Sequence, residues 1–271
     1  MTDRLDFVSE VDSNLADEYL ENGYVVRDLE SLSAFESIQE KIVVSAASFL
    51  SHEINGPSSM FLNQIHRGLD ATRLNEFRLR ILEQLHQDPT INPLYFSLAK
   101  NVLYSIVGNE LAMQKRVNLS IQLPGDESSL LPIHADTWSG DSPYEVVLWV
   151  PLVDCFKTKS MFILPPDKVH IVDQFFSTGK ENMSSEDLFE EVKSDLVWLS
   201  VKEGQYVLFN QSLPHGNRVN QEPESRWSIN CRFKSVFSPY CDKRLGEFFE
   251  PITLKPASRI GLNYEFPGGP D

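Results

Sequence analysis

The spacing of hydrophobic residues along the chain changes near residue 115. Before that point, apolar positions mostly recur every three or four residues, as they do on one face of an α-helix. Helices are predicted for the segments SNLADEYLENG, SAFESIQEKIVVSAASFLSHEI, ATRLNEFRLRILEQLHQ and PLYFSLAKNVLYSIVG, and a short strand for YVVRDL. Gly23 and the Asn55-Gly56-Pro57 turn are typical ends for the first two helices. We expect these helices to pack outside a sheet.

From Arg116 onward apolar and polar residues alternate, which is the period of a β-strand with one polar face. The first such strand carries Asn118, Ser120 and Gln122 on its polar face. Further strands are predicted for YEVVLWVPL, KSMFILPP, LVWLSV and GQYVLFNQ. The last strand alternates strictly and has four polar residues on one face: Arg226, Ser228, Asn230 and Arg232. Such a polar face is typical of a strand that faces water or a ligand cavity.

The order of these elements predicts a mainly β protein with flanking helices. Many short strands after a helical opening indicate a sandwich or jelly roll, and the capping-box pair Ser184 and Asp187 begins a helical insertion near residues 184–196. No repeat or linker divides the sequence. We therefore expect one domain over residues 1–271, with a mainly helical part at 1–114, a jelly-roll core at 115–240 and a C-terminal extension at 241–271.

The composition excludes several classes of partner. A formal charge of −15 and a pI near 4.8 disfavour nucleic acid and anionic membrane surfaces, because a negative field repels phosphate groups. The three widely spaced cysteines form neither a disulfide framework nor a cysteine zinc site. The acidic N-terminal stretch lacks a signal-peptide core, and no apolar run is long enough to span a membrane. We expect a cytoplasmic protein that acts on a small molecule, and the sequence leaves its oligomeric state open.

A candidate metal site begins with His134 and Asp136, two residues apart between apolar runs in LLPIHADTWSGDSPYEVVLWVPL. Roughly one such pair is expected by chance in this composition, so the pair needs a partner. His86 and Asp88 have the same spacing but end a predicted helix before a proline, which indicates a solvated helix terminus. His215, just after a predicted strand, is the partner. Two histidines and one carboxylate bind one face of iron(II) and leave the other open, which predicts an oxygenase site.

Candidate cofactor contacts lie on the polar strand faces. Arg226 and Ser228 follow His215 in the sequence, and a guanidinium pairs in a fork with a carboxylate while a hydroxyl adds a further bond. We expect these two residues to hold the distal carboxylate of 2-oxoglutarate, with O₂ as the co-substrate. Asn118 and Gln122 are candidates for cofactor or substrate contacts, and the alternative for them is a solvated sheet face.

Five more residues are candidates for substrate contacts, each with a structural alternative. Trp138 and Trp149 could stack on a substrate ring or pack in the core. Lys115 and Arg116 could pair with a substrate phosphate or lie exposed at the start of a strand. Arg232 could contact the substrate or form a structural salt bridge, because a buried guanidinium needs an anionic partner.

These residues resemble a known family. His134-Ala-Asp136, His215 and Arg226-Trp-Ser228 are similar to the motifs of the iron(II) and 2-oxoglutarate dependent dioxygenases. The stretches ENGYVVRDL, VVLWVPLVDC, KSMFILPP and PHGNRVN resemble the phytanoyl-CoA hydroxylase superfamily, and within it a branch found in bacterial carbohydrate biosynthesis clusters. The likeness runs from about Tyr19 to Tyr264. One departure is Gly216-Asn217, where many relatives have Gly-Ser.

The resemblance implies a double-stranded β-helix (a cupin-like jelly roll) with iron ligands at His134, Asp136 and His215. It implies hydroxylation of an unactivated C–H bond, because Asp136 fills the position that related halogenases leave open for halide. The implied substrate is a sugar or nucleotide-linked sugar of surface polysaccharide biosynthesis. Two alternatives remain: a cupin-type sugar isomerase or epimerase, which needs neither Arg226 nor a redox metal, and a non-catalytic carbohydrate-binding barrel.

Overall fold

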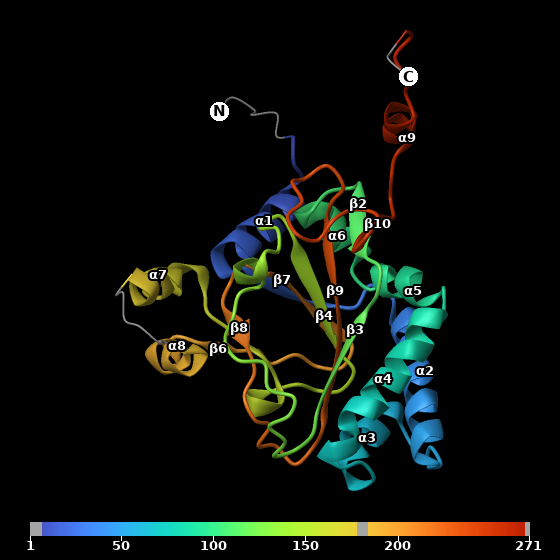
Figure 1. Ribbon diagram of the computed structural model, residues 1–271, viewed down its shortest axis with the longest axis vertical. Coiled ribbons are helices and arrows are strands. Elements are labelled where there is room, and N and C mark those ends of the chain that lie inside the picture. The colour runs from blue at the N-terminus through green and yellow to red at the C-terminus, as the bar shows by residue number, and fades with distance from the viewer. Residues whose placement is uncertain (1–6, 178–183, 269–271) are drawn as a thin grey trace.

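The computed structural model describes residues 7–177 and 184–268, and the first six residues of the expected N-terminal helical part lie outside this description. Two antiparallel sheets form the centre of the molecule, and helices cover their outer faces (Figure 1). The larger sheet has the strand order β1-β7-β4-β9-β2-β10, and β3 pairs with the other part of β9. The smaller sheet has the order β6-β5-β8. The expectation of a mainly β core with flanking helices is confirmed.

The strands and helices have the following bounds. The larger sheet consists of β1 (Tyr24–Asp28), β2 (Leu111–Gln114), β3 (Asn118–Gln122), β4 (Val146–Pro151), β7 (Gln205–Asn210), β9 (Arg226–Ser235) and β10 (Phe249–Pro251). The smaller sheet consists of β5 (Phe162–Ile163), β6 (Val197–Trp198) and β8 (His215–Gly216). The helices are α1 (Glu10–Asn22), α2 (Leu32–Leu50), α3 (Ser58–Asn63), α4 (Ala71–Gln87), α5 (Ile91–Ser97), α6 (Lys100–Ile106), α7 (Val169–Ser177), α8 (Ser185–Val192) and α9 (Pro256–Leu262).

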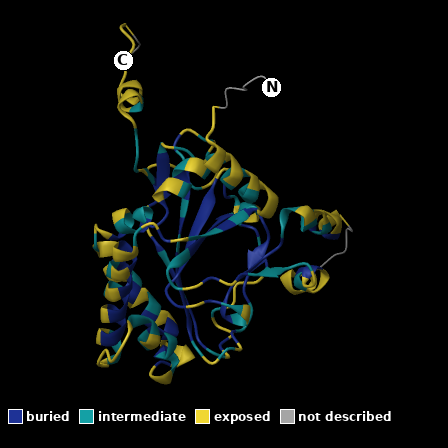
Figure 2. Cartoon of the chain, turned by 180° about the vertical axis from the view of Figure 1, so that it is seen from behind, coloured by how far each residue is buried: buried dark blue, intermediate teal, exposed yellow. Residues whose placement is uncertain are grey.

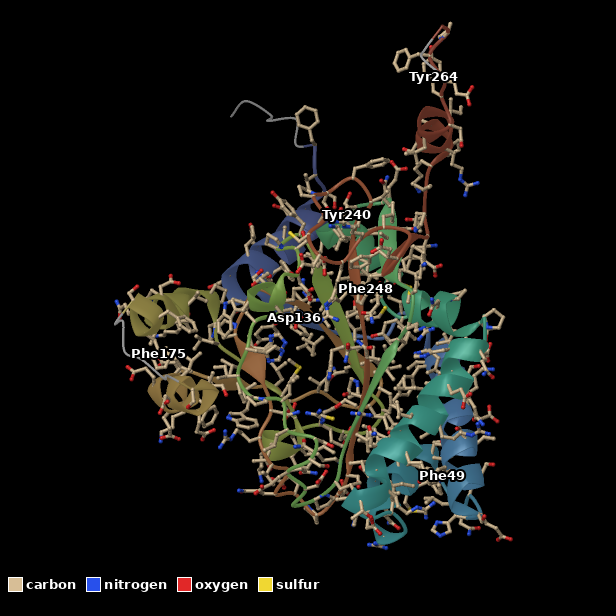
Figure 3. The ribbon with its side chains drawn as sticks, in the orientation of Figure 1. Phe49, Asp136, Phe175, Tyr240, Phe248 and Tyr264 are labelled. Atoms are coloured by element: carbon tan, nitrogen blue, oxygen red, sulfur yellow. The ribbon has the colours of Figure 1, made fainter. Side chains whose placement is uncertain are left out.

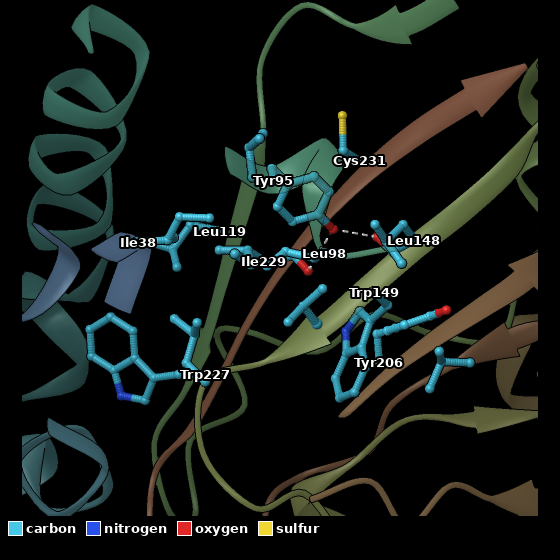
Figure 4. Packing of buried hydrophobic residues seen from close by; sticks show 14 of the residues in the cluster. Ile38, Tyr95, Leu98, Leu119, Leu148, Trp149, Tyr206, Trp227, Ile229 and Cys231 are labelled. Carbon is cyan, nitrogen blue, oxygen red and sulfur yellow. Dashed lines mark hydrogen bonds between the residues drawn. The ribbon is translucent and has the colours of Figure 1, made fainter. Parts of the chain in front are cut away.

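Strand β9 divides the interior into an apolar and a polar side. Its apolar residues Trp227, Ile229, Cys231 and Phe233 are buried in the main hydrophobic core with the inner faces of α2, α4 and α5 (Figure 4). Tyr95 of α5 ties this core to the sheet, because its hydroxyl donates to the Leu148 carbonyl at 2.6 Å. The strict alternation of β9 therefore turns its polar residues to the opposite face of the sheet.

A second, smaller core covers the outer side of the small sheet. It joins Phe162 and Leu164 to buried residues of α7 and α8 (Val172, Phe175, Leu188 and Val192). Helix α8 begins with the expected capping box, in which Ser184 and Asp187 each accept a hydrogen bond from the other's backbone N–H. In Figure 1 this helix pair stands at one flank of the molecule, away from α2 and α4.

Several elements differ from the sequence expectations. The segment PLYFSLAKNVLYSIVG forms two helices, α5 and α6, because Glu30 interrupts it. The backbone N–H of Glu30 donates to the Leu98 carbonyl, and its carboxylate accepts from the backbone N–H groups of Asn101 and Val102, which starts a new helix. Strand β2 lies in the part expected to be helical, and α3 and α7 were not predicted. Among the described residues, none of the helices has the length and apolarity needed to cross a bilayer.

Replacing Phe77 of α4 with alanine should destabilise the fold by about 3–5 kcal/mol, because it leaves a cavity in the main core. Phe77 is fully buried, and its ring packs edge-on against Trp227 at 5.8 Å between centroids. Chemical denaturation measures the effect. The control is Leu79→Ala on the exposed side of the same helix, which should change the free energy of unfolding by less than about 0.5 kcal/mol. Equal losses in both variants would contradict this account of the core.

Candidate metal centre

A cavity of about 280 Å³ lies between the two sheets, on the polar side of β9. Asp136 lies near the centre of the molecule in Figure 3. Both sheets and the segment between β3 and β4 contribute to the wall of this cavity. The lining residues are Asn118, Ser120, Leu131, His134, Asp136, Val147, Trp149, Met161, Phe209, His215, Gly216, Asn217, Arg226, Asn230 and Arg232.

His134 and His215 are held side by side by the backbone. Each donates its backbone N–H to the carbonyl of the other, and their ring centroids lie 4.4 Å apart. The Nδ1 atom of His134 lies 2.9 Å from the Pro132 carbonyl, and that of His215 lies 2.8 Å from the Leu213 carbonyl. Since a carbonyl only accepts, each Nδ1 carries the proton and each Nε2 remains available as a ligand.

Asp136 begins a short 3₁₀ helix (Asp136–Ser139), and its backbone N–H donates to the carbonyl of Gln211. Its two carboxylate oxygens have different surroundings. Oδ1 lies 3.4 Å from Nε2 of His134, while Oδ2 accepts a hydrogen bond of 2.7 Å from the guanidinium of Arg232. Burial raises the pKa of Asp136, but the adjacent His134 imidazole and the charge of Arg232 outweigh burial and hold that pKa well below its ordinary value. The carboxylate is therefore ionised.

The three side chains fit a metal ion. One ligand atom from each of His134, Asp136 and His215, the three ligand candidates, lies within 4.8 Å of the other two. Burial lowers the pKa of His215 to about 4, so its imidazole is neutral and able to bind a metal at neutral pH. Two imidazoles and one carboxylate on one side of an ion leave other positions open, which is the ligand set of non-haem iron(II) oxygenases.

Arg232 belongs to a polar network behind Asp136. Its Nε donates to the side-chain oxygen of Gln211 at 3.0 Å and lies 3.5 Å from the carboxylate of Asp141. Gln211 in turn donates to the carboxylate of Glu145 at 3.0 Å. With two acidic partners, Arg232 forms the structural salt bridge that was one of the two sequence-based alternatives. Arg232 binds Oδ2 of Asp136 and leaves Oδ1 available for a metal.

Replacing Arg232 with glutamine should weaken metal binding about 10- to 100-fold, the usual cost of losing a residue that orients a metal ligand. Without the guanidinium, the Asp136 carboxylate is free to rotate and gains a second exposed oxygen. Titration of the metal-free protein with iron(II) under anaerobic conditions measures the change. Arg218→Gln is the control, because Arg218 pairs with Glu186 on the surface and lies outside the cavity. An unchanged affinity in Arg232→Gln would show that Asp136 needs no such support.

Arg226 lies at another part of the cavity wall and is almost fully buried, with 3% of its surface exposed. Its guanidinium donates to the hydroxyl of Ser120 at 2.7 Å and to the carbonyl of Ser160 at 3.3 Å. Within residues 7–177 and 184–268 no carboxylate forms an ion pair with it. Four buried polar atoms near it have no hydrogen-bond partner: Arg226 Nε, Ser228 Oγ, Ser160 Oγ and Gln122 Oε1. This region has an uncompensated positive charge and unused hydrogen-bonding capacity.

The remaining sequence candidates occupy different places. Asn118 and Trp149 line the cavity, and Asn118 donates to the side chain of Asn230 at 3.0 Å. Gln122 is buried opposite Arg226 in the β3–β9 pair and donates to the Arg218 carbonyl. Ser228 is buried two residues from Arg226 in β9. Neither Gln122 nor Ser228 lines the cavity.

Three further candidates lie away from the cavity and from Arg226. Trp138 is about half exposed and packs edge-on against Phe176 of α7. Lys115 and Arg116 are both exposed, and Lys115 lines a separate groove beside β10. Any contact that these three make with a substrate would therefore have to occur outside the described cavity.

Several cavity residues were not singled out from the sequence as contacts. Ser120 bonds Arg226, and its place on the predicted polar strand face was the available signal. Asn217 exchanges hydrogen bonds with the backbone of Leu131, just before the first metal-ligand candidate. Gly216 lets this segment approach β8, since an added Cβ would lie 2.7 Å from the Leu131 carbonyl oxygen. The Gly216-Asn217 pair thus holds the two histidine-bearing segments together.

Comparisons with known proteins agree with this architecture. No family model matches the chain, and no curated protein matches it. Among solved structures, EctD from S. alaskensis with bound Fe has a TM-score of 0.55 at 17% identity, over 87% of this chain and 81% of that chain. HygX from Streptomyces hygroscopicus with nickel and 2-oxoglutarate has a TM-score of 0.51 at 14% identity, over 88% of this chain and 90% of that chain. The chain shares their fold. The expected jelly-roll core is thereby confirmed.

Proposed function

We propose that this protein is an iron(II) and 2-oxoglutarate dependent oxygenase that hydroxylates a C–H bond of a small molecule, with a sugar or nucleotide-linked sugar as the substrate. His134, Asp136 and His215 hold the metal, and Arg226 with Ser228 holds the distal carboxylate of 2-oxoglutarate. EctD has also been solved with 2-oxoglutarate and 5-hydroxyectoine, at a TM-score of 0.52 and 18% identity, and HygX with 2-oxoglutarate. Those ligands agree with the proposal.

The observation that carries the proposal is the buried, unpaired Arg226 in the same cavity as the three ligand candidates. A buried guanidinium without an acidic partner is costly, so the fold keeps it only where an anion supplies the missing charge. The orphaned Ser228 hydroxyl is a further donor for that anion. A dicarboxylate with one end at the metal and the other at Arg226 would compensate the charge of Arg226 and accept a hydrogen bond from the Ser228 hydroxyl. A sugar isomerase has no use for this arrangement.

Different residues of the cavity have different roles in the proposed reaction. When bound, iron(II) and the keto acid together supply the oxidising power from O₂. Arg226 would hold the keto acid, and Arg232 occupies one oxygen of Asp136 so that the other would bind the metal. Apolar residues of the cavity (Val147, Trp149, Met161, Phe209 and Leu131) exclude water from the reacting region. A substrate would be held in the same cavity as the metal, where orientation lowers the barrier.

The polar groups left for a substrate are mainly amides. Asn118, Asn230 and Asn217 line the cavity, and Gln114 lies within 3.3 Å of the Asn118 side-chain oxygen. Amides suit the hydroxyl groups of a neutral polyol, because they both donate and accept. The two cavity arginines are assigned to Asp136 and to 2-oxoglutarate. A nucleotide or phosphate part of the substrate would therefore lie outside the cavity.

An anaerobic titration tests the proposed cofactors. Metal-free protein receives iron(II) and then 2-oxoglutarate, and the expected result is the weak visible charge-transfer absorption of an iron-chelated keto acid. Absence of the band with iron demonstrably bound would overturn the cofactor assignment and favour a sugar-binding barrel. Oxygen uptake with a panel of free, phosphorylated and nucleotide-linked sugars then tests the substrate class. Turnover of a sugar without O₂ would instead identify an isomerase or epimerase.

A further inference from the structure

Residues 253–268, called the arm below, project from the body of the molecule beyond β10. Helix α9 lies within the arm and has no buried residue (Figures 1 and 2). The arm nevertheless carries large apolar side chains: Ile260, Leu262, Tyr264 and Phe266 are 57–78% exposed. Tyr264 stands near its outer end, and its ring packs edge-on against Phe266 at 5.0 Å (Figure 3). This is an apolar surface that nothing in the described chain covers.

Hydrogen bonds to Glu110 and Leu111 hold the first residues of the arm, its root, and direct the arm away from the body of the molecule. The Ile252 N–H donates to the Leu111 carbonyl, and the Leu111 N–H donates to the Thr253 hydroxyl, both at 2.8 Å. Glu110 then accepts hydrogen bonds from the Lys255 N–H at 2.8 Å and the Ser258 hydroxyl at 2.9 Å. These contacts set the direction of α9. A seven-residue helix with no further packing is marginal in water, so it needs a second surface for stability.

A suitable surface lies beside the root. A groove of about 510 Å³ runs between the end of α4, α5 and the β2–β10 edge, and no part of the described chain fills it. Its apolar wall consists of Leu85, Pro93, Phe96, Met113, Pro251 and Ile252. Its charged residues are Glu250, Lys115 and Asp88, and Asp88 already pairs with Lys41 at 2.7 Å. The arm carries Lys255 and Arg259 against a single acid, Glu265. Groove and arm therefore match in apolarity, and Glu250 of the groove can pair with a cation of the arm.

We infer that two copies of this chain exchange arms, so that α9 and the Tyr264–Phe266 pair of each copy lie in the groove of the other. Pro251 and Ile252 form part of the groove and lead directly into the arm, so a two-fold axis beside them places each arm over the partner's groove. The anchor at Glu110 directs the arm away from its own body. A lipid surface is disfavoured, because the chain has a net charge of −15.

Sedimentation of the full chain over a range of concentrations tests the exchange. We expect a dimer, and the double substitution Ile260→Asp with Leu262→Asp should weaken dimerisation about 30-fold or more, as loss of buried interface anchors does. The control is Phe237→Asp, a similarly exposed aromatic residue outside arm and groove, which should dimerise normally. A monomer at every concentration, or a dimer indifferent to the double substitution, would overturn the inference. Circular dichroism confirms that the variants are folded.

A disulfide experiment decides where the arm lies. Leu262→Cys and Pro93→Cys are placed in separate chains on a Cys241→Ser background, because the other two native cysteines are buried. After mixing and mild oxidation, a covalent dimer between the two chains is the expected product. When both substitutions share one chain, a cross-linked monomer in place of a covalent dimer would show that the arm folds into its own groove. Sedimentation of wild-type protein with anionic phospholipid vesicles would likewise count against the exchange.

Discussion

Replacing His215 with alanine is expected to abolish tight binding of iron(II), with a loss of affinity of more than about 100-fold. Removing a ligand costs more than the 10- to 100-fold that loss of an orienting residue costs, and it leaves only His134 and Asp136. The fold should survive, because His215 joins its neighbours through its backbone N–H and carbonyl, which alanine retains. Anaerobic metal titration and circular dichroism measure both effects.

The chain provides a matched control for His215. His86 and Asp88 have the same spacing as the ligand pair, but they lie at the end of α4, and Asp88 pairs with Lys41 at 2.7 Å. His86→Ala should therefore leave iron binding unchanged. If His86→Ala lowered the affinity as much as His215→Ala, or if His215→Ala bound iron normally, the assignment of His134, Asp136 and His215 as the metal site would be wrong.

Replacing Arg226 with methionine should have opposite effects on cofactor binding and on the stability of the ligand-free protein. Loss of one partner of a buried charged contact costs about 2–5 kcal/mol, so the dissociation constant for 2-oxoglutarate should rise about 30-fold to several thousand-fold. Without ligand, however, Arg226 is a buried cation that pairs with no carboxylate in the described part of the chain, and burial lowers its pKa. Methionine removes that desolvation cost and should raise the free energy of unfolding by about 1–4 kcal/mol.

Thermal unfolding with and without iron and 2-oxoglutarate measures both effects. In the wild type, 2-oxoglutarate at 100 times its dissociation constant should add about 2.7 kcal/mol of stability, and in Arg226→Met the same concentration should add less than about 0.9 kcal/mol. Arg116→Met is the control, because Arg116 is exposed and outside the cavity. A variant that is less stable without ligand and still gains stability from 2-oxoglutarate would show that Arg226 has a purely structural role.

Local sequence patterns predicted the elements well where packing agreed with local preference. Helix α4 lies within its predicted segment, and α1 ends at Gly23 in the left-handed conformation that glycine favours. The patterns failed where distant residues intervened. Glu30 splits one predicted helix into α5 and α6, and pairing with β9 and β10 makes a strand of β2. No local window contains these partners.

The sequence by itself determined the alternation of β9, the short spacing of His134 and Asp136, and the presence of Arg226 on the same polar face as Arg232. Those features depend on neighbouring residues and on the two-residue period of a strand. Only the tertiary structure decided that His215 meets His134 and that Asp136 and Asp141 neutralise Arg232. It also decided that no carboxylate of residues 7–177 and 184–268 pairs with Arg226. The reason is physical: charge compensation and burial depend on groups brought together from distant segments, and their positions are fixed only when the sheets pack.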